Sequence, residues 1–444
     1  MERKRRRNSG SEPFFDRRGI PTVTRLPGSA SVILGAILPF ALCGQVDQVA
    51  LVNQARAKIV ANIKRLPKYT CLQTVHRARF EKVPSVRSRS CSYLDDSAKN
   101  LPRLSLAWTD RFKLDVTVSG GAEIFSWAGA ESFQSEHLEK IVGSGMAGTG
   151  DFGPFLMSIF GSGASGYEYL GPEQDKGRTL AVYRYHVPMS ASRYEFNVGP
   201  RPDDTVTLSY EGRFWIDSQN AELSRMTIEV PHPPQESETC RIETTIDYRQ
   251  ARIGGSDFLL PQLTVLKLWD VEVHRYENQI EYASCREFRS ETVFRTDSDG
   301  AAAGASEVSK ISVALPPGIR IKIALRSKIS LETSFAGDVV EGRLLNAIGD
   351  MIPKGAVVRG RIVRFQREYL HSNYIAIGLK FDSAEVNGRE VPLTLMPATR
   401  GASIKPDRIE KRQGIGMFTF PVDRLVLDQK FFSEWKTAAG KPAK

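Results

Sequence analysis

The stretch YEGRFWIDSQNAELSRMTIEV, residues 210–230, contains two runs in which apolar and polar residues alternate. Between the runs, residues 217–220 read Asp-Ser-Gln-Asn, which are residue types typical of turns. Alternation with a period of two on both sides of a turn predicts an antiparallel hairpin with one apolar face. The apolar positions that define this face are Phe214, Ile216, Met226, Ile228 and Val230.

The same alternation recurs through most of residues 44–296, which we interpret as one domain. A long series of antiparallel strands cannot stay flat, because sheet twist accumulates from strand to strand. The sequence therefore predicts a mainly β (α+β) protein built on a large curved antiparallel half-barrel. Besides the hairpin, we expect strands at residues 70–80, 112–118, 123–127, 179–187, 194–198, 205–210, 241–253, 263–273 and 279–294.

An amphipathic helix is predicted before the first strand. Asp47 is a suitable N-cap, and Pro67 ends the pattern. A single apolar stripe on this helix indicates that it lies against the sheet. The stripe consists of Val52, Ala55, Ile59, Ile63 and Leu66.

Residues 151–160, DFGPFLMSIF, interrupt the strand pattern between two glycine-rich stretches, after a helix predicted at 136–142. The glycines do not form a phosphate-binding loop, since no Lys-Ser/Thr pair follows and no strand precedes them. We predict a short apolar helix that lies as a lid across the mouth of the curved sheet and contacts an apolar ligand; the alternative is a core helix with loose flanking loops. The candidate ligand-binding residues are Phe155, Leu156, Ile159 and Phe160.

The first 43 residues have the layout of an export signal. They contain eight Lys or Arg and three acids, and they end in SVILGAILPFALC, an uncharged run followed by small residues. We therefore predict a signal peptide over 1–43 and an extracytoplasmic location, in the periplasm or outer envelope, with an uncleaved anchor as the alternative. The formal charge of the whole chain is +10, but no dense basic run lies beyond the signal, so nucleic acid is not an expected partner.

Four cysteines remain after the predicted signal, an even number consistent with disulfides in an oxidising compartment. Cys71 and Cys91 lie symmetrically about residues 81–84, as cross-strand partners in a hairpin would. This symmetry favours the pairs Cys71–Cys91 and Cys240–Cys285, although all three pairings remain open. No CxxC spacing occurs, which gives no support for a zinc or redox site.

Residues 297–310 are rich in Gly, Ala, Ser and Asp and are predicted to link two domains. Residues 311–400 then carry short strands with Pro/Gly corners, and Asn387-Gly388 is a strong hairpin signal. We expect a small all-β barrel or sandwich here, followed by a hairpin and tail over 401–444. The expected strands are 311–315, 319–325, 339–345, 357–365, 374–383 and 390–395, with the hairpin at 417–427.

Motifs for catalysis or metal binding are missing from the sequence. The six histidines show no HxH or HExxH spacing, and no serine has GxSxG surroundings. We therefore expect a protein that is not an enzyme and has no catalytic residues, metal site or cofactor.

Two parts of the chain resemble known families. Residues 46–297 resemble the LolA-like lipoprotein carriers in their export signal, first helix and meander, and in a hairpin element formed by Trp215, Ile216, Asp217, Leu223 and Arg225. More narrowly, LPKYTC (66–71), GTGDFGPFLMSIF (148–160) and CREF (285–288) look like an uncharacterised exported family common in acidobacteria-type genomes. The carrier resemblance implies a half-barrel that shields acyl chains under a helical lid.

Residues 311–395 resemble the C-terminal β-barrel of TrbI-type conjugation proteins, which are pore components of type IV secretion. The segments LPPGIRIKIAL (315–325), FAGDVVEGRLLNAI (335–348) and MIPKGAVVRGRIV (351–363) occur in that family's order. The pore-forming parts of the family have no counterpart in this sequence, so the resemblance implies an assembly or wall-facing module.

The leading hypothesis is a non-enzymatic envelope protein that binds an apolar ligand, a lipid or a lipoprotein, in the curved sheet. The alternative is a structural or protein-interaction module of the envelope without a ligand cavity, which would contact another envelope protein. Membrane contact is expected only through the signal or peripherally.

Overall fold

A computed structural model describes residues 47–83, 90–95, 103–119, 122–130, 138–142, 148, 150–161, 166–199, 204–288, 315–370, 373–398, 414–422 and 426–438. Several expectations fall outside these residues: the signal peptide at 1–43, the linker at 297–310 and nearly all of the strand at 311–315.

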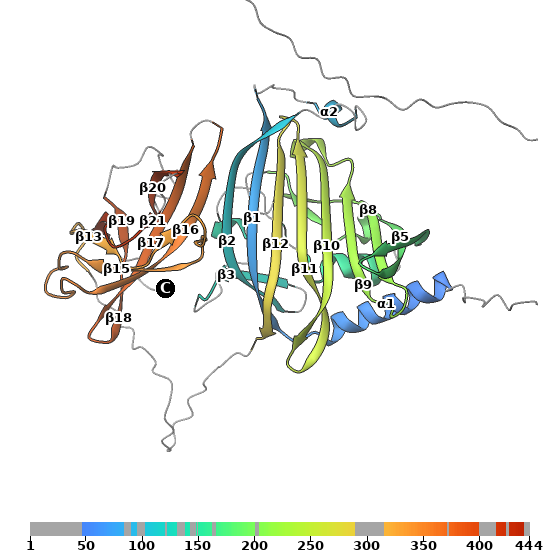
Figure 1. Ribbon diagram of the computed structural model, residues 1–444, viewed down its shortest axis with the longest axis horizontal. Helices are drawn as coiled ribbons and strands as arrows, with labels where there is room; N and C mark the ends of the chain where they lie inside the picture. Colours follow the sequence, from blue (N-terminus) through green and yellow to red (C-terminus); the bar gives the residue numbers. More distant parts are fainter. Residues whose placement is uncertain are drawn as a thin grey trace, which may run out of the picture. The chain divides into compact units, whose positions relative to one another are not determined.

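The first part of the chain is a curved antiparallel sheet, as predicted (Figure 1). Its strands are hydrogen-bonded in the order β4-β5-β8-β9-β10-β11-β12-β1-β2-β3, so the first strand of the chain lies in the interior of the sheet. The strands are β1 (Tyr69–Lys82), β2 (Leu104–Ser119), β3 (Ala122–Trp127), β4 (Glu168–Asp175), β5 (Arg178–Val187), β8 (Tyr210–Asp217), β9 (Leu223–Val230), β10 (Thr239–Ile253), β11 (Ser256–Asp270) and β12 (Arg275–Glu287).

The predicted hairpin is β8–β9, in which Phe214 pairs with Met226 and Ile216 with Leu223. Its apolar residues continue a row of side chains that crosses the sheet from β2 to β5 on one face. We call this face, which also carries the N-terminal helix, the covered face. The row runs through Phe112, Val75, Ile280, Thr264, Ile246, Met226, Phe214 and Tyr183, each paired with the next.

Two features of this region differ from the sequence prediction. Strand β4 was not expected, because it is an edge strand that is exposed along most of its length and therefore has no apolar alternation. Strands β6 (Glu195–Asn197) and β7 (Thr205–Thr207) pair only with each other, as a small separate ribbon.

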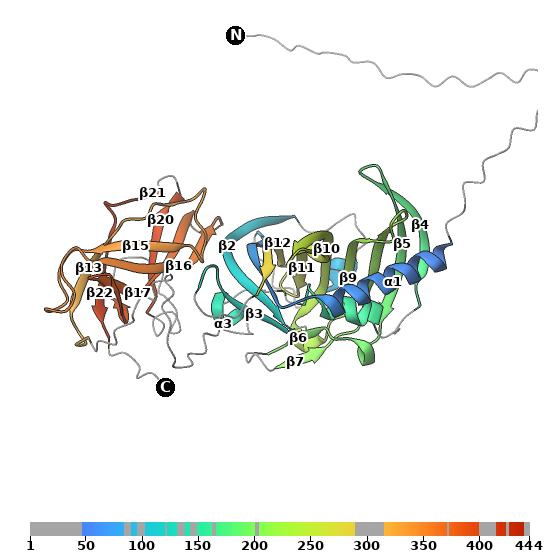
Figure 2. The same ribbon diagram turned by 90° about the horizontal axis from the view of Figure 1, so that it is seen from below.

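The predicted helix is α1 (Gln48–Arg65), and the Asp47 side chain caps it by accepting hydrogen bonds from the amides of Val49 and Ala50. Figure 2 shows α1 crossing the sheet from β5 towards β11. Both ends are attached to the sheet: Tyr183 donates to the carbonyl of Gln48, and Asn62 bonds to Leu259. The shorter helices are α2 (Ser92–Asp95), α3 (Glu139–Val142), α4 (Pro154–Leu156), η1 (Met157–Gly161), η2 (Met189–Ala191) and η3 (Gln235–Ser237).

All four predicted cysteines form disulfides, but the favoured pairing is wrong. Cys71 is bonded to Cys285 and Cys91 to Cys240. The strand that pairs with β1 begins only at Leu104, so the cross-strand partner of Cys71 on β2 is Val116. Cys91 lies instead beside the short helix α2, outside the hairpin that the symmetric spacing suggested.

The last part of the chain is all β and has no closed barrel among its described residues. Strands follow in the order β19-β22-β13-β15-β16-β17, and the free edge of β17 pairs with both β18 and β20. The Asn387-Gly388 hairpin is confirmed, because both residues have positive φ and connect β17 to β18. The bounds are β13 (Arg320–Leu325), β14 (Ile329–Ser330), β15 (Val339–Leu344), β16 (Val357–Glu368), β17 (Tyr374–Val386), β18 (Arg389–Pro392), β19 (Leu395–Pro397), β20 (Gly416–Pro421), β21 (Val426–Leu427) and β22 (Phe432–Thr437).

Residues 46–444 form one compact unit, because the two groups of strands are directly bonded. Gln366, Arg367 and Glu368 of β16 pair with Asp110, Thr109 and Trp108 of β2. Next to this ladder, Lys113 and Ala336 are joined by a backbone hydrogen bond of 2.8 Å. Strand β20 pairs with β17, β21 with β14, and β22 with both β13 and β19. Strands β20 and β21 therefore do not form the hairpin expected at 417–427. Within the described part of the chain, no helix has the length and apolar character needed to cross a membrane.

Candidate functional site

The covered face is occupied by a segment of the chain that we call the plug segment, residues 150–161. It contains one short α-helical turn, α4, followed directly by the π-helical turn η1. The four residues predicted to contact a ligand are buried against the sheet: Phe155, Leu156, Ile159 and Phe160 are at most 5% exposed. They share one hydrophobic cluster with α1 and with strands β5, β8, β9, β10 and β11.

The aromatic side chains of the plug segment each contact aromatic rings outside it. Phe152 packs edge-on against Tyr282, with ring centroids 4.8 Å apart, and against Tyr69 at 5.8 Å. Phe155 contacts Tyr194 at 5.2 Å. Phe160 contacts Phe214 of the hairpin at 5.0 Å. Tyr69, Tyr282 and Phe214 of the sheet, together with Tyr194 beside it, therefore form a line of aromatic contacts along the plug segment.

Helix α1 binds the far end of the plug segment. The Arg56 guanidinium donates through Nε to the carbonyl oxygen of Phe160 at 2.7 Å and through Nη2 to that of Gly161 at 3.5 Å. These carbonyls end a helix and have no partner within it, so Arg56 satisfies them. Tyr167 adds a hydrogen bond of 2.8 Å to the carbonyl of Ile159.

The near end of the plug segment is held by two carboxyl groups. Glu123 of β3 accepts hydrogen bonds from the backbone amide of Gly150 at 3.0 and 3.1 Å, and the amide of Phe152 also bonds to it. Asp151, which is 3% exposed, accepts a hydrogen bond of 2.6 Å from the hydroxyl of Tyr282 on β12. The plug segment therefore has a polar end at Asp151 and an apolar body from Phe152 to Phe160.

Burial dominates the electrostatics of this polar end. It raises the pKa of Glu123 to about 7, an effect to which the neighbouring Asp151 charge adds. Burial also raises the pKa of Asp151, although the hydrogen bonds from Tyr282 and Thr264 oppose the shift. The tyrosine hydroxyls that face Asp151 stay neutral, since burial and then the Asp151 charge raise the pKa of both Tyr248 and Tyr282.

Three buried polar atoms near this point have no hydrogen-bond partner among the described residues. They are the hydroxyls of Tyr69 and Tyr248 and the side-chain oxygen of Gln73. These side chains are 0%, 6% and 1% exposed, respectively. A buried polar atom without a partner costs about 1–3 kcal/mol, so native proteins keep few of them.

A second candidate site lies where β2 meets β16. A polar cavity of about 370 Å³ opens there, next to a space of about 20 Å³ that is large enough for one water molecule. The residues that line the larger cavity include His76, Arg77, Thr109, Arg111, Glu277, Phe365, Arg367 and Tyr369.

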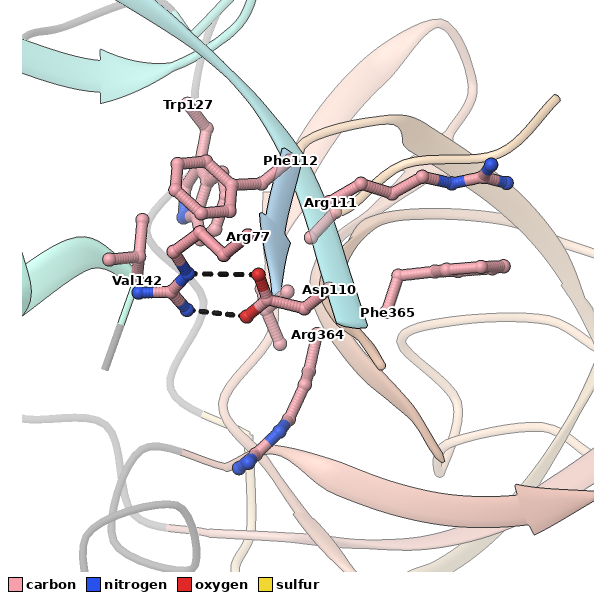
Figure 3. Close-up of a pocket in the computed structure, with 10 residues that line it drawn as sticks. Arg77, Asp110, Arg111, Phe112, Trp127, Val142, Arg364 and Phe365 are labelled. Atoms are coloured by element: carbon pink, nitrogen blue, oxygen red, sulfur yellow. Dashed lines mark hydrogen bonds and ion pairs between the residues drawn. The ribbon is translucent and has the colours of Figure 1, made fainter. Parts of the chain in front are cut away.

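Two arginines of this second site, Arg77 and Arg111, already have partners. Figure 3 shows Arg77 making a two-pronged ion pair with Asp110, in which Nε donates at 2.8 Å. The Arg111 guanidinium lies between the rings of Phe335 and Phe365, at 4.7 and 4.8 Å from their centroids. The Arg111 contacts join the two groups of strands, whereas the Arg77–Asp110 pair connects β1 to β2, so both arginines have a structural role.

The sequence prediction found the plug segment and missed what holds it. Glu123, Tyr282 and Arg56 lie far from the plug segment in the sequence, on strands and a helix whose local patterns reveal nothing about this contact. Asp151 was a visible signal, because it is a lone acid next to a run of apolar residues. In the described part of the chain, no cluster of His, Cys, Asp and Glu is arranged to bind a metal ion.

Fold and site together define a class of structure, an open curved antiparallel sheet whose apolar face is covered by a helix and a glycine-flanked plug. No protein-family model and no curated protein matches the sequence. Among solved structures, a LolA superfamily protein from Nitrosomonas europaea is 9% identical and has a TM-score of 0.22, covering 56% of this chain and 97% of that one.

Two further matches have similar values. A DUF1329 family protein from Desulfovibrio piger is 10% identical, covers 55% of this chain and 95% of its own, and has a TM-score of 0.25. The Mycobacterium tuberculosis lipoprotein LppX is 11% identical, covers 55% and 98%, and has a TM-score of 0.20. Scores this low carry no argument about ligands, and the fold assignment rests on the ladders described above.

Proposed function

We propose that the protein is a non-enzymatic component of the cell envelope that binds an apolar ligand on the covered face, in the place taken by the plug segment. The observation that supports this most directly is the line of aromatic contacts between the plug segment and the sheet. An elongated apolar ligand, such as a lipid or the lipid part of a lipoprotein, can make the same contacts with Tyr69, Tyr282, Tyr210 and Phe214.

Three features of the plug segment support the proposal that it can leave the covered face. It contributes no strand to any ladder, and it is held at its two ends by polar bonds, at Glu123 and Asp151 on one side and at Arg56 on the other. Between these ends, Ser158 bonds to Tyr210 and the Ile159 carbonyl accepts from Tyr167. It also contains a π-helical turn, a feature frequent at functional sites. Exchange of the plug for a ligand would keep the apolar face covered.

The cysteines support the proposed location outside the cytoplasm. Two disulfides join parts of the chain separated by 214 and 149 residues, and such bonds persist in oxidising compartments. We further propose that the chain consists of a signal peptide at 1–43, a carrier-like domain at 44–296 and a TrbI-like domain at 311–400.

A structural or protein-interaction module is the second candidate function. The observation in its favour is that the covered face is filled by the protein's own side chains, with Phe155, Leu156, Ile159 and Phe160 in the core. In this case the plug segment is a permanent part of the core, and a partner protein binds elsewhere.

Binding of the apolar dye diphenylhexatriene to the full chain distinguishes the two candidates. We expect the double variant Phe155→Ala/Phe160→Ala to bind the dye at least ten times more tightly than the native protein, because each lost phenyl group weakens the plug by about 3–5 kcal/mol. The matched control is Phe381→Ala, which removes a phenyl group buried between β17 and Trp435, far from the plug in the sequence and in its contacts. Dye binding to neither the native protein nor the double variant would establish the structural module instead.

A further inference from the structure

The plug segment has the same order of chemical groups as a fatty acid. The Asp151 carboxyl group comes first, and the apolar side chains of Phe152, Phe155, Leu156 and Phe160 follow it along the covered face. We propose that the hydroxyls around Asp151 form a head-group subsite, which takes the carbonyl oxygen of an acyl carboxyl group, free or esterified, in place of Asp151. This inference rests on the proposed function and adds the class of ligand.

The subsite on the sheet is made of hydrogen-bond donors. Tyr282 already donates to Asp151 at 2.6 Å, and the Thr264 hydroxyl faces the same carboxyl group. The hydroxyl of Tyr248 is close enough for the Asp151 charge to raise its pKa, yet it has no hydrogen-bond partner among the described residues. A carbonyl oxygen has two lone pairs and can accept from two of these hydroxyls at once.

The charges around the subsite select against other head groups. Glu123 of β3 is an acid that interacts with the Asp151 charge, and no described Lys or Arg bonds to either carboxyl group. Arg249, the residue after Tyr248, is exposed and reaches only the backbone carbonyl of Tyr282. A phosphate head would therefore meet a carboxylate without any counter-charge, which is strongly unfavourable in a buried site.

A quaternary ammonium head is disfavoured for a different reason. It has no lone pair to accept a hydrogen bond, so the hydroxyls of Tyr282 and Thr264 would lose the Asp151 carboxyl group as a partner, and the Tyr248 hydroxyl would remain without one. Leaving buried donors unpaired costs more than the lost bond itself. An acyl carbonyl satisfies these donors without adding charge, and a free acid can share the proton that Glu123 carries below about pH 7.

The test measures how four amphiphiles with the same sixteen-carbon chain displace diphenylhexatriene from the full-length Phe155→Ala/Phe160→Ala protein. They are hexadecanoic acid, methyl hexadecanoate, hexadecyl phosphate and hexadecyltrimethylammonium. We expect the acid, the ester or both to bind at least ten times more tightly than the phosphate and the ammonium compound. Preference for the acid alone assigns free fatty acids as the source of the acyl group, whereas equal or tighter binding of the ester assigns acylated lipids or lipoproteins.

Replacing a subsite donor identifies the contact. Adding Tyr282→Phe should weaken binding of the preferred acyl compound about 5- to 30-fold relative to the dye, the loss expected for one hydrogen bond to a carboxyl group. Thr264→Val serves the same purpose if the tyrosine variant does not fold. The control is Tyr185→Phe, since the Tyr185 hydroxyl donates instead to the Thr227 carbonyl, at 2.7 Å.

The outcomes separate the two proposals. If the dye binds but the phosphate or ammonium compound binds as tightly as the acyl compounds, the subsite is wrong while the apolar site stands. The same holds if neither Tyr282→Phe nor Thr264→Val changes the preference. If the dye does not bind at all, the proposed function itself fails.

Discussion

Two buried acids at the polar end of the plug segment make the stability of the folded protein depend on their ionisation. Glu123 and Asp151 are buried acids whose partners come from different strands, and a buried acid destabilises the folded protein once it is ionised. No pattern within 27 residues of sequence links Glu123 to Gly150, because their contact depends on the path of the whole chain. Sequence analysis can therefore flag Asp151 as unusual, but it cannot find its neighbours.

The protein should become more stable as the pH falls from 8 to 5. The pKa of Glu123 is about 7 in the folded state, whereas its ordinary value is 4.5. Between these pH values the folded protein therefore binds the proton more tightly than the unfolded chain does. The stabilisation is complete below pH 4.5 and is lost as the pH rises through 7. A shift of this size corresponds to a change in the free energy of unfolding on the order of 3 kcal/mol. The raised pKa of Asp151 changes the stability in the same direction.

Thermal unfolding of the native protein and of Glu123→Gln across this pH range checks the assignment. We expect the pH dependence of Tm to become clearly flatter in the variant, since the amide does not titrate. Glu211→Gln, at an exposed position of β8, should leave the slope as it is. A slope equally steep in Glu123→Gln would mean that another group is responsible.

At the scale of elements, the period of apolar residues predicted most of the first sheet and helix α1. Apolar periodicity gives no signal for an element without a buried face, such as the exposed edge strand β4. Cys91 was also misplaced, since a symmetric spacing about a turn predicts pairing only when both arms are strands. Helix α1 also differs from the prediction. Its buried face includes the polar residue Asn62, which is buried because it contacts β11.

Asn62→Ala should detach the C-terminal end of α1 from the sheet. The Asn62 side chain donates to the carbonyl of Leu259 at 3.1 Å and accepts from its amide at 2.9 Å, as a neighbouring strand would. Alanine leaves both buried backbone groups without a partner, at a cost of about 2–4 kcal/mol in the free energy of unfolding.

Chemical denaturation measures this loss. The control is Lys64→Ala, an exposed position on the same helix, where we expect a change within about 0.5 kcal/mol. A loss for Asn62→Ala no larger than that of the control would show that water replaces the bonds to Leu259.

At the scale of the whole molecule, the sequence predicted two groups of strands but not the ladder between them. Residues 366–368 of β16 pair with residues 108–110 of β2, and neither segment has an alternation that distinguishes it from other strands. The close approach depends on a glycine. Gly337 has a φ of +100°, and a Cβ at this position would collide with the backbone carbonyl of Lys113.

Gly337→Ala should therefore disrupt the contact between the two groups of strands. Gly355→Ala is the matched control, because Gly355 has a φ of +92° but no atom within 4 Å of an added Cβ. Both variants carry the cost of a left-handed alanine, about 1–2 kcal/mol. We expect Gly337→Ala to lose clearly more stability than Gly355→Ala and to become more sensitive to protease in 315–438. Equal losses would mean that Lys113 moves aside easily.

The place of β1 in the sheet has a consequence for how the protein is made. This strand emerges near the start of the chain, yet one of its two neighbours is β12, whose residues follow about two hundred positions later. Until β12 arrives, one edge of β1 offers its amides and carbonyls to any other extended chain. A newly made molecule thus carries an open edge for most of its synthesis, and chaperones that shield that edge would protect it from pairing with other chains.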